Sequence, residues 1–395
     1  MKSERQILHV IASQGYPNSF GKFRMQAWVE NVNTLIRDEH TKIVLFSCGE
    51  KRLSYCKNGD EMIISKRLGM LRDPFSFDTI VRVLLSKKPS IAIVHGLQHL
   101  LTLSSLMIYS LRKIPVIIIV HGLYLPDSKL SISRDRLLKL IISRFRGPYT
   151  AIALSRHDRL MLLRDWDIPN DRIKTMKTFL YLSPEEQKKI DQVREQNQAL
   201  ISHTPDKVAF LYIGRLDQHQ KRVDYLVKTF DEFLKRSGNP DVELVIVGEG
   251  PLKKSLEQMV KNLSIQKQVK IVGAVSEEEK WLRYLTSTAV ILASRYEGIP
   301  RVLFEAFATG SIVIAPNICG LAEVIRNGVN GFLYNNREEL FDILDFVATN
   351  KQVILTMKSL NRDMASKTFN LGKGKEEMSL VIRSLQDVKN RSIGR

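Results

Sequence analysis

The residues that most clearly indicate a chemical function in this 395-residue chain are two carboxylates eight positions apart, Glu297 and Glu305. Glu297 follows a short apolar run at 289–293, and Glu305 lies in a stretch of helical character. A strand that stops at a Gly-Pro turn and continues as a helix presents a helix N-terminus, whose N–H groups and dipole attract anions. A carboxylate at each end of that site suggests a ligand with phosphate in the middle and hydroxyls on both sides. A nucleotide-sugar fits this description.

Two cations follow another apolar run, at 208–213. Gly214 permits a sharp turn, and Arg215 and Lys221 come shortly after it. The forked donors of arginine and the point charge of lysine both suit a diphosphate. Arg222 is adjacent to Lys221, so the choice of cation stays open, and an ordinary basic surface loop is the alternative interpretation.

Glycine-containing loops follow other apolar runs. Gly248 comes directly after the run at 243–247, and Val272 ends the run at 269–272. Both could contact a nucleobase, although tight turns of a doubly wound fold would look the same. Gly21 lies in a two-glycine loop ahead of an expected helix, where the backbone could approach a phosphate closely; an ordinary loop is again the alternative.

One histidine stands out by its position. His121 ends the long apolar run that begins at residue 116. There it could hydrogen-bond a sugar or stabilise charge that develops during a reaction. A lone histidine is more often structural. His95 and His99 follow a similar but shorter run, and His95 repeats the same His-Gly pattern, so His121 is preferred to these two alternatives.

Short apolar, β-branched runs alternate with longer amphipathic stretches throughout the chain. The runs expected as strands are residues 7–12, 42–47, 62–65, 91–95, 116–121, 150–154, 208–213, 243–247, 269–272, 290–293, 312–315 and 331–333. Continuous apolar strands separated by helices indicate parallel sheets that are covered on both faces. We therefore expect an α/β protein with two Rossmann-like doubly wound domains, which bind ligands at the carboxyl ends of their strands in a cleft between them.

The domain boundaries are placed by composition. Residues 1–180 form the first expected domain, residues 181–206 a linker in which Ser183-Pro184 starts a polar helix, and residues 207–374 the second domain. The amphipathic tail at about 375–395 is expected to pack back on the first domain.

Composition and charge narrow the class of protein. Hydrophobic content of 44% and charged content of 26% are ordinary for a soluble globular protein. No run approaches the roughly 18 apolar residues that span a bilayer, and the N-terminus does not resemble a signal peptide. The three cysteines have neither metal-ligand nor disulfide-framework spacing. These observations predict a cytoplasmic protein.

The positive charge is concentrated in the first half. Residues 1–180 carry 29 Lys and Arg against 15 Asp and Glu, whereas the remaining residues carry 31 against 27. This asymmetry favours an anionic partner, whether nucleic acid, acidic lipid or a phosphorylated substrate, although it could also serve solubility alone. The basic and apolar segment at 132–146 resembles an interfacial helix on anionic lipid; a helix that packs on the sheet is the alternative.

Several chemistries have no support in the sequence. No Asp-x-Asp pair follows a strand, and no His/Cys cluster has metal-ligand spacing. There is no P-loop and no Gly-x-Ser-x-Gly elbow. We therefore expect a reaction that needs neither a bound metal nor a cofactor.

The order of the motifs resembles that of a known family. Gly214-Arg215-Leu216, Gly248-Glu249-Gly250-Pro251, Glu297-Gly298-Ile299-Pro300 and Glu305-Ala306 follow one another as in the retaining glycosyltransferases of family 4, which carry an E-x7-E motif and have the two-Rossmann GT-B fold. The resemblance covers most of the chain and is strongest at 208–334. The chain departs from it at 177–181, where the usual Asn-Gly is missing, and in the unusual cation Arg301.

The resemblance implies a role for each candidate. Glu305 would bind the nucleotide ribose, Glu297 would contact hydroxyls of the donor sugar, and Arg215 and Lys221 would hold the diphosphate as leaving group. His121 would lie at the sugar, and the Gly21 loop would close over the phosphates. The segment whose backbone would line the same phosphates consists of Gly298, Ile299, Pro300, Arg301 and Val302.

The implied activity is transfer of a hexose-type sugar from a nucleotide-diphosphate sugar to a glycan acceptor. We expect a lipid-linked oligosaccharide, or a polysaccharide or glycoprotein glycan precursor, at the cytosolic face of a membrane to which the protein binds peripherally. A soluble acceptor, as in sucrose or trehalose synthesis, is the second candidate. A basic nucleic-acid-binding protein is a third, and it would leave the two glutamates unexplained. An enzyme that resembles glycogen phosphorylase is a fourth.

Overall fold

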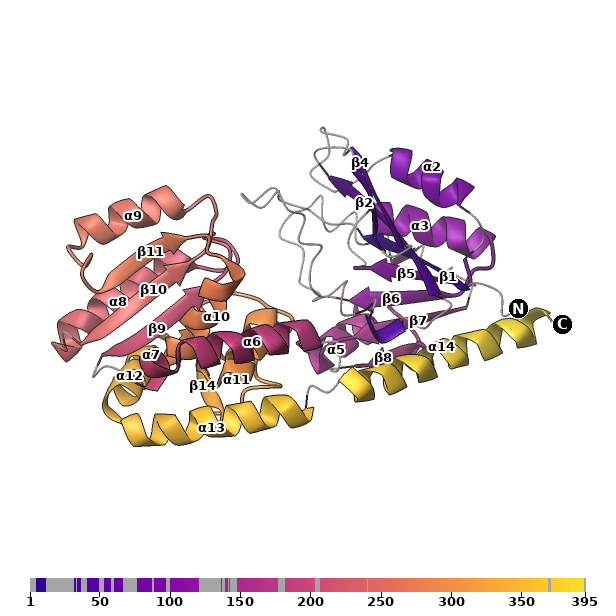
Figure 1. The fold of residues 1–395 in the computed structure, drawn as a ribbon. Coiled ribbons are helices and arrows are strands. Elements are labelled where there is room, and N and C mark those ends of the chain that lie inside the picture. The colour runs from indigo at the N-terminus through magenta and orange to yellow at the C-terminus, as the bar shows by residue number, and fades with distance from the viewer. Residues whose placement is uncertain are drawn as a thin grey trace. The chain divides into compact units, whose positions relative to one another are not determined.

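The structure is a computed structural model. It describes residues 5–11, 32, 34–36, 41–49, 53–57, 60–66, 77–86, 89–96, 100–120, 136, 139–140, 142, 148–176, 182–202, 207–239, 241–368 and 371–393. The chain divides into two compact α/β units, shown in Figure 1. The first unit is Met1–Phe179 together with Leu371–Arg395, and the second is Leu180–Asn370.

The first unit is built on an eight-stranded sheet with the order β3-β4-β2-β1-β5-β6-β7-β8. Its strands are β1 (Arg5–Ile11), β2 (Thr41–Gly49), β3 (Leu53–Lys57), β4 (Asp60–Lys66), β5 (Ile91–His95), β6 (Val116–Val120), β7 (Tyr149–Ala153) and β8 (Ile173–Thr175). All pairs are parallel except β3 with β4. Every residue of β5, β6 and β7 is buried, as expected for strands with helices on both faces.

The helical elements of the first unit are α2 (Phe77–Leu85), α3 (Leu100–Leu111), α5 (Arg156–Arg164), the 3₁₀ turn η1 (Asn170–Arg172) and α14 (Leu371–Ile393). The start of α5 is fixed by Ser155, whose hydroxyl accepts a hydrogen bond from the Asp158 backbone N–H at 2.9 Å. The last helix, α14, contacts β7, so the C-terminal segment belongs to the same unit as the N-terminal strands.

The second unit has a six-stranded, all-parallel sheet with the order β11-β10-β9-β12-β13-β14. Its strands are β9 (Val208–Ile213), β10 (Val242–Val247), β11 (Val269–Gly273), β12 (Ala289–Ile291), β13 (Ile312–Pro316) and β14 (Gly331–Tyr334). Numbered within the unit, this is the 3-2-1-4-5-6 order of a Rossmann fold. The strand order therefore reverses between β9 and β12, and ligands of such sheets bind at the carboxyl ends of the strands at that point.

The helices of the second unit are α6 (Pro184–Gln196), α7 (Gln198–Ser202), α8 (Val223–Ser237), α9 (Lys253–Asn262), α10 (Glu277–Thr286), α11 (Arg301–Thr309), α12 (Arg337–Thr349) and α13 (Lys351–Thr368). Helices α6 and α7, which were expected to form a linker, lie inside this unit, and α6 packs on α10. A buried aromatic contact joins α8 to the sheet, with the Phe210 and Phe230 rings 5.9 Å apart.

The structure contains a strand for every run that was expected to form one. It adds β3 and β8, which were not predicted from the sequence. Asn58-Gly59 stands between β3 and β4 in the sequence, and such a pair is a typical signal for a hairpin. β8 has only three residues, too few for a period-2 pattern to be recognised.

Candidate functional site

Arg215 follows β9, at the edge where the strand order reverses. Its backbone carbonyl accepts a hydrogen bond from the Tyr212 hydroxyl at 2.9 Å, and its Nε lies 2.7 Å from Asp217 Oδ2. Asp217 Oδ1 accepts hydrogen bonds from the backbone N–H groups of Gln220 (2.8 Å) and Lys221 (3.1 Å). One carboxylate therefore orients the guanidinium and shapes the loop that carries the lysine.

The charge of Asp217 is maintained by these partners. Burial alone would raise the pKa of this carboxyl, but hydrogen bonds from the backbone N–H groups of Lys221 and Gln220, together with the Arg215 guanidinium, lower the pKa below its usual value. Asp217 therefore stays ionised at neutral pH and keeps its hold on the loop.

Lys221 and Glu297 are in direct contact, although 76 positions separate them in the chain. Lys221 Nζ forms a short ion pair with Glu297 Oε1, and the Ser294 hydroxyl donates to the same oxygen at 2.7 Å. The two loops are also joined through their backbones, because the Arg295 N–H donates to the Gln220 carbonyl at 2.8 Å. Lys221 and Glu297, which the sequence indicates independently, thus meet beyond the carboxyl ends of β9 and β12.

The glycines after β10 have a packing role that the structure makes explicit. A Cβ atom at Gly248, whose φ is +146°, would lie 1.8 Å from the Gly214 carbonyl oxygen, and one at Gly250 would lie 2.3 Å from the Leu216 carbonyl oxygen. The loop after β10 therefore presses its backbone against the loop that carries Arg215. A nucleobase contact by Gly248 remains a prediction, and so does one by Val272, a residue near the end of β11 that is 37% exposed.

The turn between β12 and α11 has the strand–turn–helix form that the sequence predicts. Gly298 and Ile299 lie in the connection, and Pro300 is the N-cap of α11 without a side-chain capping bond. Gly320, at φ +86°, packs so closely that a Cβ atom there would lie 2.3 Å from the Gly298 carbonyl oxygen. The backbone next to Glu297 is thus packed closely against Gly320. A contact between phosphate and the backbone of this segment, including Val302, remains a prediction.

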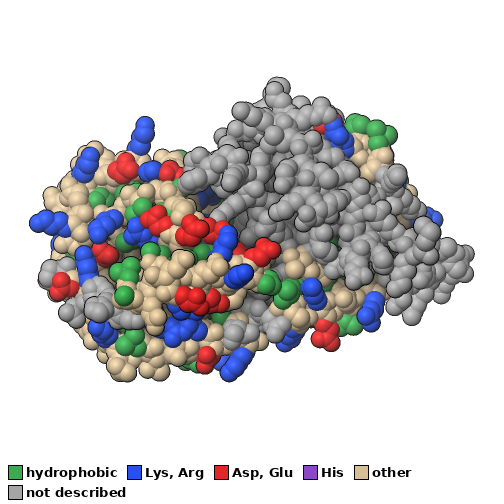
Figure 2. All heavy atoms as spheres, viewed as in Figure 1, with side chains coloured by type: hydrophobic (Ala, Val, Ile, Leu, Met, Phe, Trp, Pro, Cys, Tyr) green, Lys and Arg blue, Asp and Glu red, His purple; other side chains and the backbone are tan. Residues whose placement is uncertain are grey.

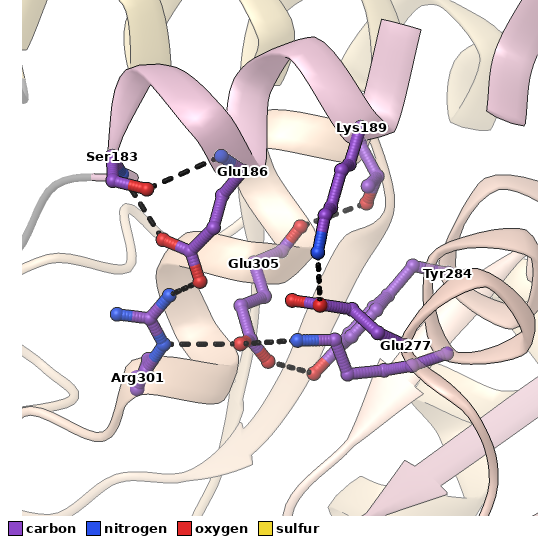
Figure 3. Close-up of polar contacts among 9 residues, drawn as sticks. Ser183, Glu186, Lys189, Glu277, Tyr284, Arg301 and Glu305 are labelled. Atoms are coloured by element: carbon purple, nitrogen blue, oxygen red, sulfur yellow. Dashed lines mark hydrogen bonds and ion pairs between the residues drawn. The ribbon is translucent and has the colours of Figure 1, made fainter. Parts of the chain in front are cut away.

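Glu305 lies one turn into α11 and is 8% exposed (Figure 3). Its Oε1 accepts from Lys280 Nζ and from Arg301 Nε, each at 3.1 Å, and its Oε2 accepts from the Tyr284 hydroxyl at 2.8 Å. Burial would raise the pKa of Glu305, but the charges of Lys280 and Arg301 and the hydrogen bonds from Tyr284 and Lys280 lower it below its usual value. Glu305 is therefore an ionised, firmly oriented acceptor.

Arg301 joins Glu305 to a second carboxylate. Its Nη2 forms a short ion pair with Glu186 of α6, while its Nε bonds Glu305 (Figure 3). Burial would lower the pKa of Arg301, but the charges of Glu305 and Glu186 raise it above its usual value. From the sequence alone, Arg301 was no more than an unusual cation near the phosphates.

Other predicted residues lie outside the described part of the chain. This holds for Gly21 and His121, and for most of the segment 132–146. His95, the less preferred histidine, ends β5 and is buried. The predicted contacts of Gly21 and His121 with a donor remain predictions.

The residues that hold the candidates in place were not predicted from the sequence. Glu186 stands three positions after Ser183, which signals a helix cap but not a contact with Arg301. Lys280 and Tyr284 are four apart on an expected helix, so they share a face, yet nothing in the sequence says what that face meets. Asp217 and Ser294 carried no signal beyond their closeness to the motifs. Among the residues that the structure describes, no group of three or more His, Cys, Asp and Glu could hold a metal ion.

Residues 193–367 match the family model described as glycosyl transferases group 1. An uncharacterized glycosyltransferase of Methanocaldococcus jannaschii is 32% identical over 126 residues, which cover 32% of this chain and 31% of that protein. A phosphatidylinositol N-acetylglucosaminyltransferase GPI3 subunit of Saccharomyces cerevisiae is 27% identical over 170 residues, or 42% of this chain and 36% of that protein. The chain thus spans roughly a third of the length of these two relatives.

The Anabaena protein HepE, solved in complex with UDP, has the same fold. Its TM-score is 0.71 with 17% sequence identity, and the match covers 96% of this chain and 100% of that chain. Together with the two sheets, which are parallel apart from the β3–β4 pair, this similarity confirms the GT-B fold predicted from the sequence. The family match places the glycosyltransferase group 1 pattern in the second unit, which carries Arg215, Lys221, Glu297 and Glu305.

Proposed function

We propose that this protein is a glycosyltransferase that takes a sugar from a nucleotide-diphosphate donor. The observation that carries the proposal is the meeting of Lys221 and Glu297 at the point where the strand order of the second unit reverses. A cation and a carboxylate side by side suit a donor that has phosphate next to sugar hydroxyls. The UDP complex of the Anabaena protein supports a nucleotide as the other part of that ligand.

The roles that we assign follow from the charge changes of transfer. When the bond between the sugar carbon and the phosphate oxygen breaks, the carbon gains positive character and the leaving diphosphate gains negative charge. Arg215 and Lys221 would stabilise that diphosphate because they are fixed before the reaction. Asp217 and Glu297 hold the two cations in their loops, so little reorganisation is needed as the charge develops.

We assign the two glutamates to the hydroxyls on either side of the diphosphate. Glu297 would accept hydrogen bonds from the donor sugar, and Glu305 from the ribose. Ionised carboxylates are strong acceptors, and Glu305 is kept ionised by its neighbours. Glu305 has the larger set of partners of the two, which fits a binding group better than a group that changes charge.

We further propose transfer with retention of configuration and without a metal ion. The acceptor hydroxyl would attack the sugar carbon on the face that the diphosphate leaves, and its proton would pass to a leaving phosphate oxygen. The new bond joins the sugar carbon to the acceptor oxygen as the carbon–phosphate oxygen bond breaks. No protein carboxylate then has to act as nucleophile, unlike in a double displacement. His121 would lie beside the sugar, as the family resemblance implies.

For the acceptor we propose a lipid-linked glycan or glycan precursor at a membrane surface. The name of the yeast relative includes phosphatidylinositol, a lipid. Among the described helices none is long and apolar enough to cross a membrane. The excess of positive charge in residues 1–180 suits an anionic lipid headgroup.

A candidate contact surface lies on α2 and α3, and we call it the α2–α3 apolar surface. Its members are large hydrophobic residues that are between 48% and 84% exposed: Val81, Leu84, Leu85, Met107 and Leu111. Figure 2 shows hydrophobic side chains gathered at the upper right, where Figure 1 labels α2. The Arg112 guanidinium, next to Leu111, donates to the Ser86 carbonyl at 2.8 Å and so ties the ends of α2 and α3 together.

The donor proposal is tested by a thermal-shift screen of the full chain against uridine, guanosine and adenosine diphosphate sugars. A ligand that binds only the folded state raises the unfolding temperature. We expect one nucleotide class to raise it and Lys221→Ala to reduce the shift, with Lys228→Ala, a change on α8, as the matched control. A screen in which none of these ligands stabilises the protein would contradict the proposal.

The membrane proposal is tested by flotation of the full chain with two kinds of vesicle. We expect binding to phosphatidylcholine vesicles that contain phosphatidylglycerol and little binding to phosphatidylcholine alone. The combined variant Leu84→Ser, Leu85→Ser, Leu111→Ser should lose most of the binding. The matched control replaces three exposed leucines of the second unit, Leu200, Leu355 and Leu360, by serine.

Equal flotation of both variants would refute the role of the α2–α3 apolar surface. The lipid acceptor would be refuted by full transfer to a soluble sugar in the absence of lipid.

A further inference from the structure

Arg301 occupies a position that is unusual for a cation in a proposed phosphate site. It is the first residue of α11, where backbone N–H groups and the helix dipole already favour an anion. Its guanidinium nevertheless lies between two carboxylates, Glu305 on its own helix and Glu186 on α6. The side chain is only 25% exposed. Two of its donor nitrogens are therefore directed at protein groups.

Glu186 is a firm anchor because both of its oxygens are bonded. One pairs with Arg301, and the other accepts from the Ser183 backbone N–H at 3.0 Å, which completes the capping box of α6 (Figure 3). A second ion pair, Lys189 with Glu277 at 2.5 Å, ties α6 to α10. The carboxylate that holds Arg301 is thus fixed through its own helix.

The charges alternate along one chain of contacts. Glu186 pairs with Arg301, Arg301 with Glu305, and Glu305 with Lys280, while the Tyr284 hydroxyl bonds the second oxygen of Glu305. Within such a chain, removing one member leaves its neighbour buried and unbalanced. The orientation of Glu305 consequently depends on Arg301, and through it on Glu186.

We propose that Arg301 is a positioning residue for Glu305, held in place by Glu186 of α6, and that it does not itself bind the donor phosphates. This inference rests on the proposed function, in which Glu305 accepts hydrogen bonds from the donor ribose. It makes α6, the first helix of the second unit, part of the machinery that prepares the nucleotide site. The same contact also ties the start of that helix, at Ser183, to the site.

The pH dependence of nucleotide binding should report the arrangement. The groups that face Glu305 are Lys280 and Tyr284 from α10 and Arg301 from α11, with Glu186 of α6 behind Arg301. Glu305 accepts ribose hydroxyls best when ionised, so binding is present above its folded-state pKa and is lost as the pH falls through it. Removing the Arg301 charge takes away one of the groups that lower that pKa. The loss of nucleotide affinity at low pH, which we call the acid limb of binding, should then occur at higher pH in a variant without this charge.

Titration calorimetry of the full chain with UDP and with uridine separates positioning from phosphate binding. In Arg301→Gln, a positioning role predicts that both ligands lose affinity to a similar degree, about tenfold, as expected when an ionic hydrogen bond that orders a binding group is lost. A direct phosphate contact predicts a loss for UDP and almost none for uridine. Arg301→Lys keeps the charge but loses the forked geometry that joins the two carboxylates. Its acid limb should therefore lie between those of the wild type and of Arg301→Gln.

Glu186→Gln provides the second variant, and Lys188→Gln, an exposed change on the same helix, is its matched control. Glu186→Gln should weaken the binding of UDP and of uridine together. Lys188→Gln removes an exposed charge from α6 without touching the Glu186–Arg301 contact, and it should change neither affinity by more than about twofold. Glu305→Gln should bind weakly at every pH and show no acid limb. Thermal unfolding of each variant verifies that it is folded.

Three outcomes would overturn the inference: unchanged binding in Arg301→Gln, a loss confined to UDP, or an acid limb that does not move. Failure of the proposed function looks different. In that case the wild-type protein binds neither UDP nor the guanosine and adenosine diphosphates, or binds one of them equally well after Glu305→Gln.

Discussion

Glu297 and Glu305 share one short segment but are held in different ways. Glu297 meets one cation, Lys221, and one hydroxyl, Ser294. Glu305 meets two cations and a phenol, and all three partners donate to it. In our proposal the first group lies at the reacting sugar and the second at the ribose. The larger number of donors to Glu305 suits a group that binds a ligand in a fixed orientation.

Lys358 yields a prediction about stability at the scale of one residue. Burial lowers the pKa of this lysine from 10.5 to about 8, helped by the charge of Arg362, while its Nζ donates to the Ser287 carbonyl at 2.8 Å. Because the folded-state pKa lies below the unfolded one, the unfolded chain binds more protons between these values. The contribution of Lys358 to the free energy of unfolding should therefore rise as the pH increases from about 8 to 10.5. Below pH 8 this contribution should be lower and independent of pH.

Urea unfolding at several pH values between 8 and 10.5 tests this prediction. Lys358→Met should remove most of the rise and should not destabilise the protein at neutral pH, because a buried charge is replaced by an apolar chain of similar length. Lys367→Met, an exposed change on the same helix α13, is the control and should leave the rise in place. An identical pH profile for wild type and Lys358→Met would contradict the assignment.

At the scale of elements, the site depends on loops that touch through glycine backbones. Gly248→Ala would force a methyl group against the Gly214 carbonyl oxygen. We expect a loss of about 3 kcal/mol or more in the free energy of unfolding, from overpacking and backbone strain together. Gly238→Ala is the control, because φ there is +60° but nothing lies within 4 Å of the added Cβ atom. It should cost about 1 kcal/mol, and equal costs in urea unfolding would show that the contact is unimportant.

The elements and motifs of the second unit were largely predictable from its sequence. Apolar β-branched runs predicted all six strands, and the motif order predicted the loops that carry Arg215 and Glu297. The Lys221–Glu297 contact could be expected only once parallel strands were assumed to end at one edge. The pairing of Arg301 with Glu186 could not, because it depends on how α6 packs on α10, and no local pattern encodes that packing. In the first unit, β3 was missed although Asn58-Gly59 is a hairpin signal, because its run is short and mixed.

At the scale of the whole molecule, each unit has a core made of its own residues. One buried cluster is drawn from residues 83–173 and another from residues 210–357. The charge differs between the parts as well, since the excess of Lys and Arg lies in residues 1–180. We infer a division of labour in which the second unit binds the donor and the first meets the anionic acceptor surface.

Release of nucleoside diphosphate, from the nucleotide sugar that the thermal-shift screen identifies, measures the proposed transfer itself. The wild-type chain should release it slowly in water and faster with a suitable acceptor. Lys221→Ala should reduce the rate by about a hundredfold or more, because a fixed cation on the leaving group is lost, while Lys228→Ala keeps the rate. Full activity of Lys221→Ala, or no release from any of the sugars by the wild-type chain, would contradict the proposed transfer.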